Sequence, residues 1–89
     1  MLRVTTDNDA NVTRLRIEGR LGGAEVQELE THWRTLRSAR PHTSILIDLT
    51  GVTSVDEEGK KLLAEMHRHG DEFVAAGVMM KAIVEEISR

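Results

Sequence analysis

Three acidic side chains stand next to one another in the middle of the chain, at Asp56, Glu57 and Glu58, and Gly59 follows them. Grouped carboxylates can act as a general acid and base, bind a metal ion, or cap a helix. Neighbouring residues of a helix point about 100° apart, so adjacent carboxylates do not converge on one substrate atom. We therefore expect no active site here, and the chain is predicted not to be an enzyme.

The other residues with reactive or metal-binding side chains predict no second site. His67 and His69 are two residues apart, whereas a metal shared on one helix needs a spacing of three or four. All four histidines are expected to be solvated. The chain has no cysteine, and Gly22 and Gly23 lack the Lys-Ser or Lys-Thr that would follow in a phosphate-binding loop. The sequence thus predicts no cofactor and no metal.

Helix capping is the plain physical explanation of the acidic triplet. A helix begins with unpaired N–H groups and a partial positive charge, so an aspartate at the N-cap and glutamates in the first turn are stabilising. Capping could by itself account for Asp56, Glu57 and Glu58. The alternative is that the triplet belongs to a binding surface.

Hydrophobic periodicity predicts seven elements along the chain. Apolar residues alternate with polar ones near the N-terminus and recur every three or four residues in later segments. The predicted strands are residues 2–6, 12–18, 44–49 and 72–76, and the predicted helices are residues 26–39, 57–69 and 78–87. The first two strands should form a hairpin around a turn at residues 7–9, with one sheet face or edge in water.

Some side chains in these elements have predicted positions. The apolar stripe of the first helix consists of Val26, Leu29, Trp33 and Leu36. Trp33 is therefore expected to be buried. The apolar run at residues 44–49 is continuous, which is typical of a central strand covered on both faces.

Two further sites are interpreted as structural. Asp48 lies in the apolar run, and we expect it to form hydrogen bonds at the strand end rather than act as a catalytic acid. Met79 and Met80 could form an adaptable contact surface, but methionine at helical spacing is more often part of the core, so both are expected to lie there.

The order of the elements is β-β-α-β-α-β-α. Helices between successive strands imply crossover connections, so we predict a mixed, mostly parallel four-stranded sheet covered by helices. A chain of 89 residues fits a single α/β domain, residues 1–89. The sequence contains no apolar run of membrane-spanning length and no signal peptide, so a soluble, cytoplasmic protein without membrane insertion is expected.

The stretch ILIDLTGVTSVDEEGKKLL, in this order of elements, resembles the STAS domain of bacterial anti-sigma-factor antagonists and of sulfate transporters. The similarity extends over almost the whole chain. Its most specific part is a buried strand that ends in Asp-Leu-Thr-Gly, a short Val-Thr-Ser-Val connection, and an acidic residue three positions before the glycine of a helix start. The resemblance implies a small STAS-like (SpoIIAA-like) domain that binds other proteins and has no catalysis of its own.

The resemblance also implies a regulatory switch that this chain lacks. In the antagonists the helix start is typically Asp-Ser-Ser-Gly or Asp-Ser-Thr-Gly, and the first hydroxyl accepts phosphate from a kinase that is also the anti-sigma factor. Glu57 stands at that position here and has no hydroxyl, so the phosphorylation site is absent. Glu57 would instead supply a permanent negative charge.

A protein partner follows from the same resemblance: an anti-sigma-factor or kinase-like protein, or alternatively a transporter ATPase or other membrane complex to which the chain is an accessory subunit. A second alternative is a small-ligand or lipid carrier with a cleft under the last helix.

The net charge of −3, with one Trp and one Phe, argues against nucleic acid as a partner. A homodimer formed through an exposed strand edge is a further alternative. The predicted partner-binding residues are Ser54, Asp56, Glu57, Glu58, Gly59, Lys60 and Lys61.

Overall fold

The computed structural model describes residues 2–8 and 12–89. Within them the elements follow the predicted order β-β-α-β-α-β-α, and the predicted α/β fold class is confirmed. The strands are β1 (Leu2–Asn8), β2 (Thr13–Leu21), β3 (Ile45–Val55) and β4 (Glu72–Val74), and the helices are α1 (Glu25–Ala39), α2 (Glu57–Arg68) and α3 (Val78–Ile87).

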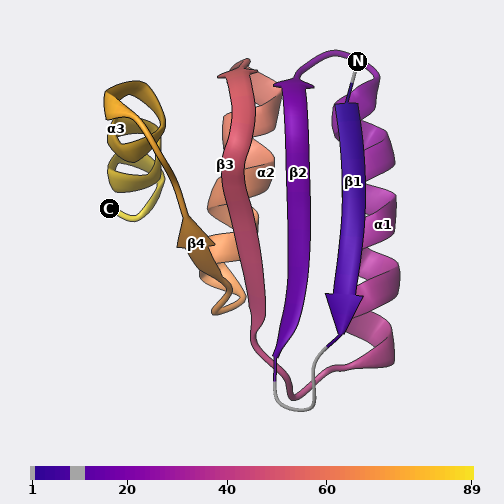
Figure 1. The fold of residues 1–89 in the computed structure, drawn as a ribbon. Coiled ribbons are helices and arrows are strands. Elements are labelled where there is room, and N and C mark those ends of the chain that lie inside the picture. The colour runs from indigo at the N-terminus through magenta and orange to yellow at the C-terminus, as the bar shows by residue number, and fades with distance from the viewer. Residues whose placement is uncertain (1, 9–11) are drawn as a thin grey trace.

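The strands form one mixed sheet in the order β1-β2-β3-β4. β1 and β2 are antiparallel, whereas β3 is parallel to both β2 and β4. Figure 1 shows α1 and α2 behind this sheet, and within residues 2–8 and 12–89 no helix lies in front of it. Each crossover adds its strand on the same side of the last one, so right-handed connections place both helices on one face. The prediction that residues 44–49 are covered on both faces is therefore wrong, and Leu46 on the open face is half-buried.

The open face of the sheet carries charged side chains that face one another across the strands. Arg3 of β1 lies opposite Glu18 of β2. Arg16 of β2 lies opposite Asp48 of β3, and its Nε is 3.7 Å from Oδ2 of that carboxylate. Opposite charges on directly paired residues stabilise a sheet. This face is therefore suited to water without a covering helix.

The core lies between the sheet and the helices. Trp33 of α1 is fully buried, as predicted. Its Nε1 donates a hydrogen bond to Oδ2 of Asp71, with 2.7 Å between the two atoms. Asp71 also forms an ion pair with Arg37 of α1 and is only 3% exposed. One buried carboxylate thus ties the segment between α2 and β4 to two side chains of α1.

Two smaller predictions concern the surface. The four histidines are exposed, as predicted. Met80 lies in the core, but Met79 is 51% exposed, so the predicted core position of Met79 is wrong. Consecutive residues of a helix point about 100° apart, and α3 therefore buries only one of the two methionines.

β3 is longer than the predicted strand at residues 44–49. It continues through the Val-Thr-Ser-Val segment, which was predicted to be a connection. This second half pairs in parallel with the end of β2, which itself extends beyond its predicted end to Leu21. Leu21 and Val55 are register partners, so the two strands end together.

The ladder between β2 and β3 has two irregularities, at which β3 uses one more residue than β2. At the first of them, Oδ1 of Asp48 accepts hydrogen bonds from the N and Oγ1 atoms of Thr50, at 3.0 and 2.7 Å. A bulge leaves a backbone donor without its ladder partner, and the Asp48 carboxylate supplies one. Asp48 therefore has the predicted structural role, but inside β3 rather than at its end.

The outer strands differ slightly from their predicted lengths. β1 continues to Asn8, which pairs with Thr13, so residues 7 and 8 of the predicted turn belong to the strand. Residue 9 of that turn lies outside the described residues. β4 ends at Val74 rather than at Ala76, because only three of its residues pair with β3.

Candidate functional site

The joint ends of β2 and β3 bring two loops together. Leu21 and Val55 are register partners, and the chain then continues through Gly22 and Gly23 into α1 and through Asp56 into α2. Both helices therefore begin at the same edge of the sheet, at the carboxyl ends of its parallel strands (Figure 1). In α/β proteins this edge commonly carries the binding site.

Asp56 is the N-cap of α2 and holds both loops. Its Oδ1 accepts a hydrogen bond from the N of Gly59 at 2.8 Å, and its Oδ2 accepts one from the N of Gly23 at 2.9 Å. Its own N donates to the carbonyl O of Leu21 at 3.0 Å. The bond to Gly23 was not predicted. Its signal in the sequence is the alanine at the N-cap of α1, Ala24, which offers no capping side chain.

Two glycines allow the loops to approach this closely. A Cβ atom on Gly22 would lie 3.0 Å from Oδ2 of Asp56. A Cβ atom on Gly59 would lie 2.8 Å from Cγ1 of Val55 and 3.0 Å from the carbonyl O of Leu21. Gly59 is itself buried, so it lets α2 pack directly on the end of β2.

The Asp56 carboxyl has a pKa below its ordinary value of 3.8. The main cause is the hydrogen bond from the Gly23 backbone, followed by that from Gly59, while the charge of Arg20 adds a smaller effect in the same direction. A carboxylate with a lowered pKa in the folded state stabilises the fold above its unfolded pKa. This contribution is lost as the pH falls through the folded pKa.

Asp56→Asn should therefore unfold at a lower urea concentration than the wild type at pH 7. The asparagine oxygen can still accept one bond in the manner of an N-cap, but the charge and the second acceptor are lost. As the pH is lowered below the ordinary aspartate value of 3.8, the difference between the two proteins should shrink, because the wild-type carboxylate becomes protonated. Urea midpoints at both pH values measure this, and a difference that does not depend on pH would contradict the assigned role.

The next two acidic residues do not share the capping role. The side chain of Glu57 is 83% exposed, with Nζ of Lys60 at 3.7 Å from its Oε1. The side chain of Glu58 is 67% exposed, with Nζ of Lys61 at 3.2 Å from its Oε1. Among residues 2–8 and 12–89, the N of Gly59 donates its hydrogen bond to the Asp56 side chain and not to either glutamate. Asp56 therefore occupies the N-cap, and Glu57 and Glu58 lie in the first turn, where negative charge suits the positive end of the helix, as the capping explanation predicted.

The remaining predicted site residues lie at different depths. Ser54 was predicted to lie in a connecting loop, but it belongs to β3 and is half-buried. Lys60 links α2 to α3, since its Nζ is 3.7 Å from both Oε1 of Glu57 and Oε2 of Glu86. The structure thus brings the glutamates and lysines together on the first turns of α2 and leaves Ser54 in the sheet.

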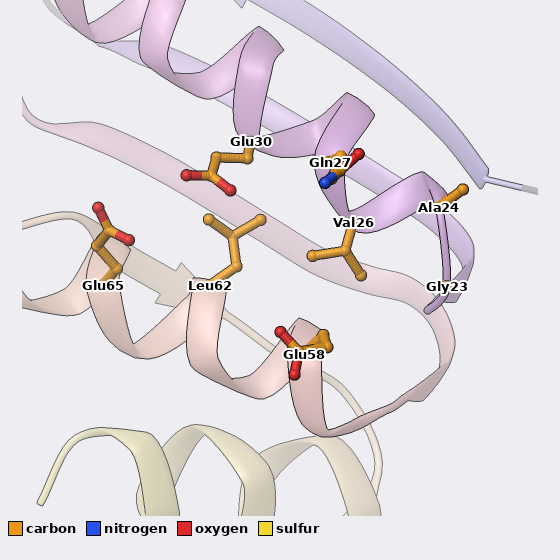
Figure 2. Close-up of a pocket in the computed structure, with 8 residues that line it drawn as sticks. All are labelled: Gly23, Ala24, Val26, Gln27, Glu30, Glu58, Leu62 and Glu65. Atoms are coloured by element: carbon orange, nitrogen blue, oxygen red, sulfur yellow. The ribbon is translucent and has the colours of Figure 1, made fainter.

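Two grooves run along α2. One has a volume of about 400 Å³ and lies between α1 and α2, where it begins beside Gly23 and Glu58 (Figure 2). The other has a volume of about 350 Å³ and lies between α2 and α3, with charged side chains such as Lys60, Arg68 and Glu86 on its walls. A lipid site is mainly apolar. The groove under the last helix therefore does not favour the alternative of a lipid carrier.

In residues 2–8 and 12–89, no three His, Asp or Glu side chains lie together as a metal ion would need. No helix in this part of the chain is both long enough and apolar enough to cross a bilayer.

Comparison of structures relates the chain to known proteins, whereas no protein-family model and no curated protein matches its sequence. A crystal structure of an antisigma-factor antagonist, a STAS domain from Rhodobacter sphaeroides, matches with a TM-score of 0.64 and 22% identity, over 91% of this chain and 90% of that one. An uncharacterised DUF3478-family protein from Shewanella loihica PV-4, with a SpoIIAA-like fold, matches with a TM-score of 0.58 and 15% identity, over 96% and 75% of the two chains. A third structure, Mglu, matches with a TM-score of 0.50 and 25% identity, over 83% of this chain but only 19% of its own.

These matches define the class of domain. The chain has the SpoIIAA-like fold, with its order of elements and its mixed four-stranded sheet. The resemblance to the STAS domain is confirmed at the level of the fold, over nearly the whole chain.

Proposed function

We propose that the chain is a non-catalytic regulatory module that binds another protein, in the manner of an anti-sigma-factor antagonist, through the first turns of α2. One observation carries the proposal. Glu57 is 83% exposed at the helix start, while Asp56 alone does the capping. Glu57 therefore adds an exposed charge to the helix start without making the capping hydrogen bond itself. In addition, the Rhodobacter sphaeroides domain of the same fold is described as an antisigma-factor antagonist.

The charge of Glu57 is the chemical core of this proposal. A phosphoserine carries about −1.5 to −2 charges and three acceptor oxygens, whereas a glutamate carries a single charge on a planar group. Glu57 thus gives a partial and permanent substitute for the phosphorylated state. A module of this kind presents the same surface at all times, and its partner is an anti-sigma-factor or kinase-like protein.

Glu57→Ser tests the proposal. The variant should unfold within about 0.5 kcal/mol of the wild type, because the side chain is exposed and makes no cap. Its affinity for the partner should change about fivefold or more, as expected when a charge at a contact is removed. The partner is first captured from a native lysate with the wild-type chain, and calorimetric titration then gives both affinities.

A matched control is Glu85→Ser on α3, whose side chain is 76% exposed. It removes the same charge from the chain at a site outside the proposed contact, and it should leave the affinity unchanged. Recovery of a transporter ATPase would replace the proposed partner class with the accessory-subunit alternative. Equal affinities of the wild type and Glu57→Ser for the captured protein would reject Glu57 as a contact.

A further inference from the structure

We propose that the groove between α1 and α2 receives an arginine or lysine side chain of the protein partner. This inference rests on the proposed function, because the groove begins at the same helix start as Glu57. It has a volume of about 400 Å³ (Figure 2), and Glu58 is among the residues that line it. Glu57 itself lines the groove on the other side of α2, so a partner that contacts both Glu57 and Glu58 spans the first turn of α2.

The floor of the groove is apolar and its walls are acidic. Val26 of α1 and Leu62 of α2 lie between the two helices, and carboxylates of Glu30, Glu58 and Glu65 stand around them (Figure 2). None of the described residues that line the groove is a lysine, arginine or histidine. A long basic side chain matches this arrangement, since its aliphatic stem packs on apolar surface while its charged head pairs with a carboxylate.

One end of the groove already shows this chemistry within the chain. Nη2 of Arg34 lies 2.8 Å from Oε2 of Glu30 and 2.5 Å from Oε2 of Glu65. The carboxylates of Glu30 and Glu65 are therefore already paired with the guanidinium of Arg34. The open position is at the other end, where the ion pair found for Glu58 among the described residues is with the exposed Lys61. An exposed pair of this kind is weak and exchanges readily for a better placed cation.

The helix starts do not repel a cation from this end. The positive ends of α1 and α2 both face Asp56, whose carboxylate accepts hydrogen bonds from the N atoms of Gly23 and Gly59. The negative charge of Asp56 offsets those two ends, and Glu58 adds another negative charge beside them. The carboxylates of Asp56 and Glu58 would repel an acidic segment or a phosphate, so the geometry favours a basic side chain in the groove.

The test uses the full chain labelled with nitrogen-15 and two synthetic probes. The first is a short helical peptide of alanine and leucine that carries arginine, and the second carries glutamate in place of arginine. The arginine peptide should shift the amide resonances of Gly23, Val26 and Leu62, and the glutamate peptide should not. Glu58→Gln should weaken binding of the arginine peptide about fivefold, the size expected of an exposed charge pair, whereas Glu85→Gln should not.

The proposal is overturned if the arginine peptide shifts only resonances outside the groove, or if Glu58→Gln and Glu85→Gln bind it equally well. This test needs no native partner, so its outcome is separate from that of the lysate experiment. Shifts confined to the groove together with an affinity unchanged by Glu57→Ser would support the groove and reject Glu57 as a contact.

Discussion

Replacing Trp33 with alanine should lower the free energy of unfolding by about 3 to 5 kcal/mol. The side chain is fully buried against the sheet, so its removal leaves a cavity. The substitution also takes away the donor that Nε1 gives to the buried Asp71. Urea unfolding followed by circular dichroism measures the loss, since the variant has no tryptophan left to fluoresce.

Trp33→Phe is the matched control, because it keeps most of the apolar volume while it removes the hydrogen bond. It should lose less stability than the alanine variant. The wild-type fluorescence should be that of an indole shielded from water. An emission maximum at the fully solvated position, or an alanine variant with the wild-type urea midpoint, would be incompatible with this packing.

Asp71→Asn should also be strongly destabilising, by about 3 kcal/mol. The Asp71 side chain is fully buried, and the change leaves Arg37, whose side chain is 19% exposed, without its ionised partner. The low exposure of Arg37 means that water replaces the lost carboxylate only in part. Urea unfolding of Asp71→Asn is compared with that of the control Glu85→Gln, which removes one exposed charge. The control should leave the free energy of unfolding nearly unchanged, so a large loss in Asp71→Asn reports the buried partner.

A double-mutant cycle decides whether Trp33 and Asp71 act together. Trp33→Phe and Asp71→Asn should show a coupling energy above about 0.5 kcal/mol, because the two side chains share a buried hydrogen bond. Strictly additive losses would mean that the two residues contribute independently, and the shared contact would then not be a source of stability.

The hydrophobic periodicity of the sequence was sufficient to predict the helices and the order of the elements. Trp33 falls on an apolar stripe, and the stripe faces the core as predicted. Periodicity could not reveal its hydrogen bond to Asp71, since the two residues are 38 positions apart and only tertiary packing brings them together. α1 ends at Ala39, two residues before Pro41, whose ring lacks the N–H group that a helix interior needs.

The length of β3 was harder to predict. Thr50 and Thr53 are exposed in a strand that bulges twice, and bulges interrupt the alternation by which strands are identified. The one-sided covering was missed for another reason. Leu46 points to the open face, and a single half-buried leucine makes the run look apolar throughout.

The candidate site was predicted in part. Asp56 was correctly placed at a helix start, because an aspartate before a helical pattern is a common N-cap. Its second partner, Gly23, lies 33 positions earlier, and no spacing rule connects the two residues. The clearest available signal was a helix that begins after two glycines and an alanine, without any capping side chain of its own.

The two hydrogen bonds that the Asp56 carboxylate accepts also have a consequence for how the surface at the starts of α1 and α2 would bind a partner. Because one carboxylate fixes the start of α1 to the start of α2, neither loop can shift without breaking a hydrogen bond of the other. The backbone of the surface is thus ordered before any contact forms, and little loop entropy is lost on association. Affinity would then follow the few side chains that make contact, and loss of an exposed charge such as that of Glu57 would change the association rate and its dependence on salt.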